Sequence, residues 1–216
     1  MRVVIYGSRQ DGHAKVVLRL VRRLGWECGG CLNDLPGHAD DTLDGLPIIG
    51  ARDALGGLRD QGIEGVVLGF GDGAGRRALL EEVRAAGLAL PSLVDPGAQR
   101  SESARVGDAA VVLRAAVLGD DVAVGDAALV NVGALLTHDV DVASGASVGP
   151  GAVLSGRSRV GRDAQVGAGA VLLPDAEVGD SAVVGAGAVV IGAVAAGTTV
   201  VGVPARPVAP PAAGRS

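Results

Sequence analysis

The sequence predicts a chain of two parts, a small α/β (Rossmann-like) domain followed by a parallel β-helix of six-residue repeats. The first observation is an aliphatic residue at every sixth position, from Val106 through to Ala196. The second is a small or β-branched residue four positions after each of these. The third is an alternation of strand-like and helix-like segments over residues 3–95, which is typical of a parallel α/β unit.

The six-residue period predicts a three-sided column. Fifteen of the sixteen aliphatic positions are Val or Leu, and Ala196 is the other. Leu118, Leu136, Leu154 and Leu172 recur every 18 residues, so each coil should contain three strands and three corners. Successive coils would hydrogen-bond at a spacing of roughly 4.8 Å. Hexapeptide repeats are the known exception to right-handed crossovers, so we expect a left-handed column.

Glycine often follows the aliphatic residue, and we expect it to supply the backbone freedom that tight corners need. These glycines are Gly107, Gly125, Gly149, Gly161, Gly167, Gly179 and Gly185. A narrow column with a small-residue interior also agrees with the composition, since the chain has only three aromatic residues, Tyr6, Trp26 and Phe70.

Charge and hydropathy argue against several classes of protein. The net charge is −5 and no basic block is present, which disfavours nucleic-acid binding. The pairs Arg22-Arg23 and Arg76-Arg77 are interpreted as solvated helix faces or single phosphate contacts. No apolar stretch of about 18 residues or signal-peptide pattern is visible, so we expect a cytoplasmic protein without a membrane span.

Cys28 and Cys31 form a single CxxC motif, for which a redox pair or half of a zinc site is one interpretation. No second cysteine or histidine pair completes four ligands. The motif also lies in an expected strand, where positions three apart face opposite sides. We therefore favour two structural cysteines and predict no metal site.

The N-terminal half predicts a sheet with ligand-binding loops at the carboxyl ends of its strands. Expected strands are Val3–Tyr6, Glu27–Leu32 and Gly65–Phe70; expected helices are one with an apolar stripe of Val16, Val17, Leu20, Val21 and Leu24, one around Arg52–Gln61 and one at about Arg76–Ala86; Asp34–Pro47 is an expected connection. The loop Gly7–Gly12 lacks a GxGxxG fingerprint, but it precedes a helix N-terminus that could hold phosphate. A purely structural cap on the column is the alternative interpretation.

His138 is the histidine most informative about chemistry. It lies two residues after the inward-facing Leu136, so it should point outward at a corner, where packing does not require it. The adjacent Asp139 would make it more basic, as a general base for acyl transfer from a thioester requires. His38, in a Gly/Asp-rich loop, is expected to be exposed, and an ordinary exposed histidine remains an alternative for His138.

Several motifs resemble one enzyme family along nearly the whole chain. They are Asn131 with Thr137-His138-Asp139, the ending Val200–Pro207, the segment Gly12–Val17, the pair Asn33-Asp34 and the turn Gly71-Asp72. Together they resemble the bacterial hexapeptide-repeat sugar acetyltransferases, which include bacillosamine- and perosamine-type nucleotide-sugar N-acetyltransferases and the sialic acid O-acetyltransferase group.

The resemblance implies a homotrimer in which the α/β domain binds a nucleotide-sugar and acetyl-CoA lies between neighbouring columns. It implies that His138 is the catalytic base and that Asp139 raises its basicity. The implied substrate contacts are Asp11, Gly12, His13, Asn33, Asp34 and Gly71, and the implied acetyl-CoA contacts are Ser147, Ala168 and Ala186. Ser147 stands where many relatives have a second histidine, and the first glycine loop is longer than theirs.

These observations together predict an α/β nucleotide-sugar-binding domain over residues 1–95, a β-helix acyltransferase domain over 96–208 and a loosely packed or disordered tail over 209–216. The leading hypothesis is acetyl-CoA-dependent N-acetylation of a nucleotide-linked amino-deoxy sugar by direct transfer. O-acetylation of a sugar of the sialic acid type and a non-catalytic, ligand-binding structural trimer remain open.

Overall fold

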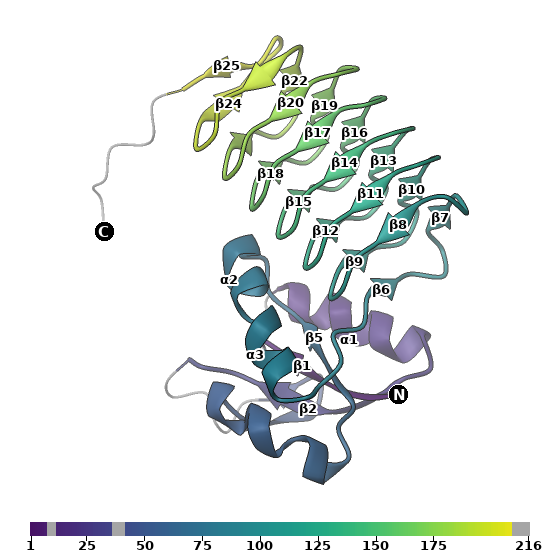
Figure 1. Cartoon of the computed structure of the whole chain (residues 1–216), viewed down its shortest axis with the longest axis vertical. Helices are drawn as coiled ribbons and strands as arrows, with labels where there is room; N and C mark the ends of the chain where they lie inside the picture. The colour runs from purple at the N-terminus through teal and green to yellow at the C-terminus, as the bar shows by residue number, and fades with distance from the viewer. Residues whose placement is uncertain (8–11, 36–41, 209–216) are drawn as a thin grey trace.

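The computed structural model describes residues 1–7, 12–35 and 42–208, and its α/β domain sits below a prism of short strands (Figure 1). His38, Asp11 and residues 209–216, for which the sequence made predictions, lie outside the described residues. The elements of the α/β domain are β1 (Arg2–Tyr6), α1 (His13–Arg23), β2 (Glu27–Leu32), β3 (Thr42–Leu43), β4 (Leu46–Gly50), η1 (Arg52–Gly57), η2 (Arg59–Gln61), β5 (Gly65–Leu68), α2 (Gly73–Ala78) and α3 (Leu80–Ala85). None of the described helices has the length and hydropathy of a membrane span.

The α/β domain is a five-stranded sheet in the order β3-β4-β2-β1-β5, parallel except for the short β3. One apolar cluster joins α1 to the sheet through Val17, Leu20 and Val21. A second cluster, which contains Leu58, Leu79 and Val83, packs η1, η2, α2 and α3 together with the sheet residues. The carboxyl ends of β1, β2 and β5 therefore open at one edge between these layers.

Three parallel sheets form the prism, and the chain visits them in turn. Face I contains β6 (Leu93–Val94), β9 (Val111–Val112), β12 (Leu129–Val130), β15 (Ser147–Val148), β18 (Gln165–Val166), β21 (Val183–Val184) and β24 (Thr199–Val201), with β25 (Arg206–Pro207) added antiparallel. Face II contains β7 (Gln99–Arg100), β10 (Val117–Leu118), β13 (Leu135–Leu136), β16 (Val153–Leu154), β19 (Val171–Leu172) and β22 (Val189–Val190). Face III contains β8 (Arg105–Val106), β11 (Ala123–Val124), β14 (Asp141–Val142), β17 (Arg159–Val160), β20 (Glu177–Val178) and β23 (Ala193–Val194).

The 18-residue period predicted from the leucines is confirmed. Leu118, Leu136, Leu154 and Leu172 pair in register along face II, and all four are at most 1% exposed. The residues four positions after the aliphatic ones, among them Ala134, Ala152 and Ser158, are buried in the same interior cluster or beside it. Because each two-residue strand points one side chain inward and one outward, a six-residue unit completely specifies one side of the prism.

The predicted role of the corner glycines is wrong. Gly149 and the six others named above do not adopt the left-handed conformation, whereas Asp121, Asp139 and Ala109 do, at φ of 57°, 57° and 54°. A Cβ on Gly149 would lie 2.7 Å from the backbone nitrogen of Ala168 on the next coil. These glycines therefore permit close stacking of coils, and the positive φ falls on other corner residues.

The last coil departs from the predicted register. Val178 pairs with Val194 instead of a residue 18 positions later, so the corner after Val190 is two residues shorter than the others. Val194 and Val200 are consequently the buried strand residues there, and Ala196 lies outside the strands. The extrapolation of the ladder to Ala196 was therefore wrong.

Local differences from the sequence prediction also occur in the α/β domain. The expected Asp34–Pro47 connection ends in the β3–β4 hairpin, and the expected helix at Arg52–Gln61 is two 3₁₀ helices. The expected helix at Arg76–Ala86 begins at Gly73 and divides at Leu79 into α2 and α3. Val16, placed on the apolar stripe of α1, is 39% exposed.

Cys28 and Cys31 are free thiols that pack against the same apolar cluster, contrary to the expectation that they face opposite sides. The register of β2 against β1 shifts between these two cysteines, which changes the alternation of side chains. Burial raises the pKa of both thiols. They are therefore protonated near neutral pH, as expected for structural cysteines.

The α/β domain docks on face I and on the corner between faces III and I. Val111, Leu113 and Leu129 of face I belong to the apolar cluster of α1, while Ala109 and Ala127 of the corner belong to the other cluster. Arg84 of α3 binds Asp108 and Asp126 on the same corner, at 2.9 and 3.3 Å. The domain that forms the sheet-edge opening is thus held rigidly against the prism.

The two leucines of β13 provide a matched test of the fold. Leu136 is fully buried and Leu135 is 36% exposed, so Leu136→Asp should unfold the prism, because an unpaired buried carboxylate costs several kcal/mol. Leu135→Asp should leave the melting temperature of the isolated chain nearly unchanged. Circular dichroism melting of both variants measures this, and a folded Leu136→Asp would contradict the register.

Candidate functional site

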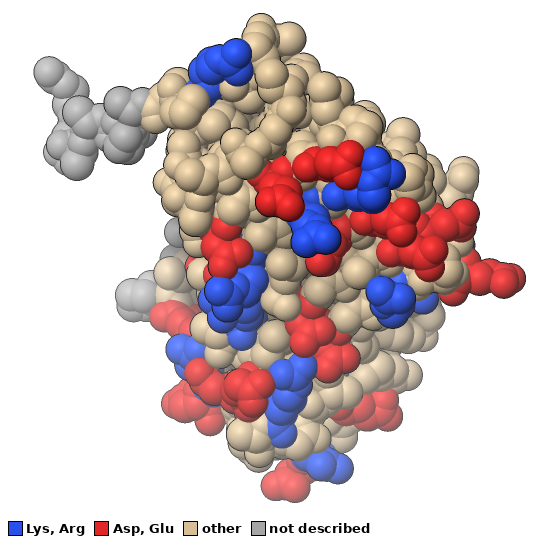
Figure 2. Space-filling model, turned by 45° about the horizontal axis from the view of Figure 1, so that its top comes forward, with Lys and Arg blue, Asp and Glu red and all other residues tan. Residues whose placement is uncertain are grey.

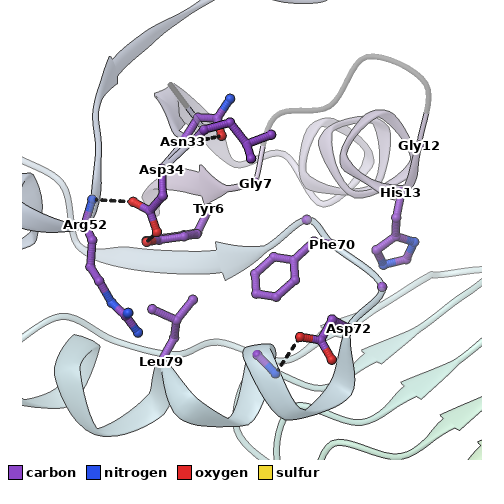
Figure 3. A pocket seen from close by; sticks show the side chains of 14 residues that line it. Tyr6, Gly7, Gly12, His13, Asn33, Asp34, Arg52, Phe70, Asp72 and Leu79 are labelled. Atoms are coloured by element: carbon purple, nitrogen blue, oxygen red, sulfur yellow. Dashed lines mark hydrogen bonds between the residues drawn. The ribbon is translucent and has the colours of Figure 1, made fainter. Parts of the chain in front are cut away.

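A cavity of about 640 Å³ opens at the carboxyl ends of β1, β2 and β5. Its lining comes from the three strand ends, the start of α1, and the η1 and α2 segments (Figure 3). The lining residues are Tyr6, Gly7, Gly12, His13, Asn33, Asp34, Leu35, Arg52, Gly69, Phe70, Gly71, Asp72, Gly75 and Leu79. Of the six predicted substrate contacts, five lie together in this lining, and Asp11 is outside the described residues.

Asp34 lies at one end of the cavity and is held by two donors. Its Oδ1 accepts the backbone N–H of Arg52 at 2.8 Å, and its Oδ2 accepts the hydroxyl of Tyr6. Burial and the Asp34 carboxylate raise the pKa of Tyr6. The neighbouring Asn33 uses its Oδ1 to accept the backbone N–H of Leu35 at 3.0 Å, so its amide N–H groups stay available.

His13 lies at the other end, beside Asp72 and across the ring of Phe70 from Asp34 (Figure 3). It is the first residue of α1, and Gly12 is the N-cap with no side-chain hydrogen bond. Burial, assisted by the charge of Arg76, lowers the pKa of His13 to about 4. Its buried Nε2 has no hydrogen-bond partner. The site therefore presents a neutral imidazole next to the free N–H groups of a helix N-terminus.

The Gly71-Asp72 turn forms the floor of the cavity between these two ends. Asp72 caps α2, since its Oδ2 accepts the backbone N–H of Gly75 at 3.0 Å. The carbonyl of Gly71 accepts from Arg76 at 2.7 Å and the carbonyl of Phe70 accepts from the same nitrogen at 3.2 Å. The turn is thus fixed by the helix that follows it.

Arg76 links the cavity floor to the prism. Its guanidinium also donates to the carbonyls of Ala127 and Gly145, at 2.8 and 3.0 Å, and to Oγ of Ser147 at 3.0 Å. It is 1% exposed, and burial lowers its pKa to about 10. The interpretation of Arg76 as a solvated residue or phosphate contact is therefore wrong, while Arg77 is exposed and binds Asp163 at 2.8 Å.

His138 and Asp139 lie on the corner between faces II and III, outside the cavity lining. Both side chains are a little over half exposed, and Nδ1 of His138 lies 2.8 Å from Oδ2 of Asp139. Because a carboxylate only accepts hydrogen bonds, Nδ1 carries the proton and Nε2 is left as the basic nitrogen. The predicted outward orientation of His138 at a corner is confirmed.

Ala168 and Ala186 lie one coil apart on the corner between faces I and II, and both are exposed. The backbone N–H of neither residue donates a hydrogen bond within the described part of the chain. Their amides are therefore available to a ligand on that corner. Ser147 lies apart from them, under α2, with its hydroxyl oxygen already accepting from Arg76.

The fold and these sites match solved acetyltransferases. A family model described as bacterial transferase hexapeptide (six repeats) matches residues 157–192. Perosamine N-acetyltransferase from Caulobacter crescentus, solved as a histidine-to-asparagine variant with CoA and GDP-perosamine, is 31% identical over 97% of this chain and 98% of that one, with a TM-score of 0.91. The acetyltransferase domain of PglB from Neisseria gonorrhoeae, with acetyl coenzyme A, is 32% identical over 96% and 98%, with a TM-score of 0.88.

This chain belongs to the bacterial hexapeptide-repeat sugar acetyltransferase family. The prism of this sugar acetyltransferase is accordingly the left-handed parallel β-helix predicted from its sequence, preceded by a small α/β domain. The comparison with curated protein sequences gave no match. Among residues 1–7, 12–35 and 42–208, no cluster of three or more His, Cys, Asp or Glu side chains is arranged to hold a metal ion.

Sequence reasoning missed several cavity residues of the sugar acetyltransferase. Tyr6, Arg52 and Leu79 contribute side chains to the lining, and Arg76 fixes its floor. Tyr6 could have been found, because it is the last residue of a strand that ends at the ligand edge. Arg76 gave no such signal, since its burial arises only from docking of the α/β domain on the prism.

Arg76 and Arg77 provide adjacent variants of opposite burial. Arg76→Met should lower the free energy of unfolding by about 3 kcal/mol or more, because several buried carbonyls lose their donor. Arg77→Met should have a much smaller effect, since its partner is reached at the surface. Urea unfolding of the two variants measures the difference, and equal losses would show that the buried contacts of Arg76 are energetically unimportant.

His13 should make stability depend on pH. Its pKa is about 4 when folded, against an ordinary value of 6.5, so between these pH values the unfolded chain binds a proton that the folded chain does not. Stability should therefore fall as pH drops from 6.5 to 4, with a slope of at most about 1.4 kcal/mol per pH unit from this group. In His13→Gln this component should vanish; an unchanged pH dependence of urea midpoints would contradict the prediction.

Proposed function

We propose that this protein is an acetyl-CoA-dependent N-acetyltransferase that acts on the amino group of a nucleotide-linked amino-deoxy sugar. The observation that carries the proposal is the His138–Asp139 pair on an acyltransferase prism that also bears a cavity with nucleotide-type contacts. The relatives support it, because the perosamine enzyme was solved with CoA and GDP-perosamine. A cytoplasmic location, where acetyl-CoA is available, is part of the same proposal.

In the proposed reaction the neutral sugar amine attacks the thioester carbonyl of acetyl-CoA directly. A C–N bond forms, the C–S bond breaks, and the amine proton passes to Nε2 of His138 before it is available to the departing thiolate. Asp139 accepts the Nδ1–H throughout, which orients the ring and stabilises the imidazolium. The acyl group passes to no protein side chain.

The cavity of the α/β domain is the proposed nucleotide-sugar site. Asn33 and Asp34 would meet the base or ribose at one end, where amide donors and carboxylate oxygens are available. Gly12, His13 and Gly71, with Asp11, would meet the phosphate and sugar end, where α1 begins. Ala168 and Ala186 are proposed to bind acetyl-CoA through their backbone amides, and Ser147 through its hydroxyl proton.

A homotrimer is proposed from the distribution of apolar surface. The outward positions of face II are Val117, Leu135, Val153, Val171 and Val189, an apolar column along one side of the prism. Face I is covered in part by the α/β domain, and face III carries charged residues such as Arg105, Asp141 and Arg159. An uncovered apolar face of this kind is suited to contact with further copies of the chain.

The proposed trimer would also complete the active site. In one chain, α2 and the cavity floor contact the corner between faces III and I through Arg76 and Gly145, whereas His138 lies on the corner between faces II and III. Asp139 lines a separate, charged groove on face III. We propose that the cavity of one subunit receives the imidazole of a neighbour.

His138→Ala should lower kcat by roughly 100-fold or more with acetyl-CoA and an amino-sugar nucleotide, because the general base is lost. Asp120→Ala, at the same corner position one coil earlier, should stay within about twofold of the unaltered protein. The measurement is CoA thiol release against a panel of UDP-, GDP- and dTDP-linked 4-amino sugars. An unchanged kcat for His138→Ala would exclude the proposed mechanism.

The same panel separates the other two hypotheses. A product ester that hydroxylamine cleaves, in place of an amide, would indicate sugar O-acetylation. Absence of acetyl-CoA binding by calorimetry at millimolar concentration would favour a non-catalytic structural trimer.

Sharing of the site between subunits predicts complementation. His138→Ala and Asp34→Ala, each inactive alone, should regain up to about a quarter of full activity when denatured together and refolded, because a random mixture of trimers pairs intact cavities with intact imidazoles. Leu135→Asp in both chains, which charges face II, should abolish the trimer in analytical ultracentrifugation and the regained activity. Without regained activity from mixed trimers, the site would belong to single chains.

A further inference from the structure

The imidazole of His138 lies directly against Gly156. Gly156 is 18 residues further along the chain and therefore occupies the same corner one coil later. A Cβ built on Gly156 would lie 2.5 Å from Nε2 and 3.2 Å from Cδ2 of the His138 ring. A real Cβ cannot occupy that position, so the ring uses the space that any side chain at residue 156 would need.

The backbone of Gly156 gives no other reason for glycine. It is absent from the residues with positive φ, so its conformation suits an L-residue. The equivalent corner positions on the two preceding coils carry the side chains of Asp120 and His138 itself. Unlike the stacking glycines such as Gly149, whose Cβ would meet the backbone of the next coil, Gly156 would meet only the imidazole.

Hydrogen bonds leave the ring as the part that has to yield. The carbonyl of His138 accepts the backbone N–H of Arg157 at 3.1 Å, and the backbone N–H of Asp139 donates to Asp120 at 2.9 Å. The backbone of the base is therefore fixed on both sides by neighbouring coils. A methyl group at residue 156 would rotate the imidazole away, and the 2.8 Å contact of Nδ1 with Asp139 would be lost or distorted.

We propose that Gly156 is a positioning residue for the reaction, which seats the imidazole of His138 so that Nδ1 meets Asp139 and Nε2 faces the reacting amine. This inference rests on the proposed function of His138 as the general base. It assigns to residue 156 no contact with substrate and no proton. The glycine acts only by the absence of a side chain, which allows the ring to lie flat on the next coil.

Steady-state kinetics tests the consequence for the reaction. Gly156→Ala should lower kcat by about 100-fold, because a displacement of about 1 Å in a catalytic group has an effect of that size, while KM for both substrates stays within about twofold. Gly192→Ala is the matched control, since a Cβ on this corner glycine of the last coil has no neighbour within 4 Å. An unchanged kcat for Gly156→Ala, or a raised KM with unchanged kcat, would overturn the proposal.

A stability cycle tests the seating independently of turnover, and so separates this proposal from the proposed function. Gly156→Ala should lower the melting temperature by about 2 °C or more when His138 is present. In the His138→Ala background the same change should have no effect, because the clash requires the ring. An equal loss in both backgrounds, including failure to fold in both, would show that the backbone requires glycine and overturn the proposal.

The tautomer of His138 provides a spectroscopic readout. Imidazole ¹⁵N shifts of the unaltered protein should show the Nδ1–H form that Asp139 selects. Gly156→Ala should lose this preference, and Gly192→Ala should keep it. The same tautomer in Gly156→Ala would show that the ring keeps its seat and would overturn the proposal.

Discussion

Backbone hydrogen bonding between successive coils at a fixed offset of 18 residues governs this structure. Each strand of the prism pairs with the strand one coil earlier and one coil later, so every position belongs to a column of equivalent positions. Inward columns must be aliphatic or small because the interior is narrow. Chemistry is confined to outward columns, and His138 interrupts one of these between Asp120 and Gly156. The base therefore inherits its position from the register.

The strength of that constraint explains which parts of the fold were predictable. A six-residue period encodes strand, corner and burial at once, so the sequence alone located the leucine column of face II. It did not reveal the shortened corner after Val190, because Val194 and Val200 are as acceptable as small residues as they are as strand residues. The reason for glycine at Gly149 was also hidden, since close approach between coils is a property of three dimensions.

The candidate site divides in the same way. Strand ends and a glycine-rich turn identified Asn33, Asp34 and Gly71, because parallel strands deliver their loops to one edge of the sheet. The low pKa of His13 and the burial of Arg76 depend on contact between the domain and the prism, to which local sequence is blind. Arg76 could be interpreted only as a helix-surface residue until its carbonyl partners, 51 and 69 residues away, were known.

The C-terminal end of the prism has a consequence for solubility. A parallel solenoid ends in a row of unpaired N–H and C=O groups, which invites another molecule to continue the stack. Here β25 turns back and pairs antiparallel with β24, with Pro207 opposite Val200, so the terminal strand of face I runs against the direction that further coils would follow. The shortened last coil breaks the 18-residue offset on the way to this strand. Growth into fibres is thereby blocked at the end where the repeat stops.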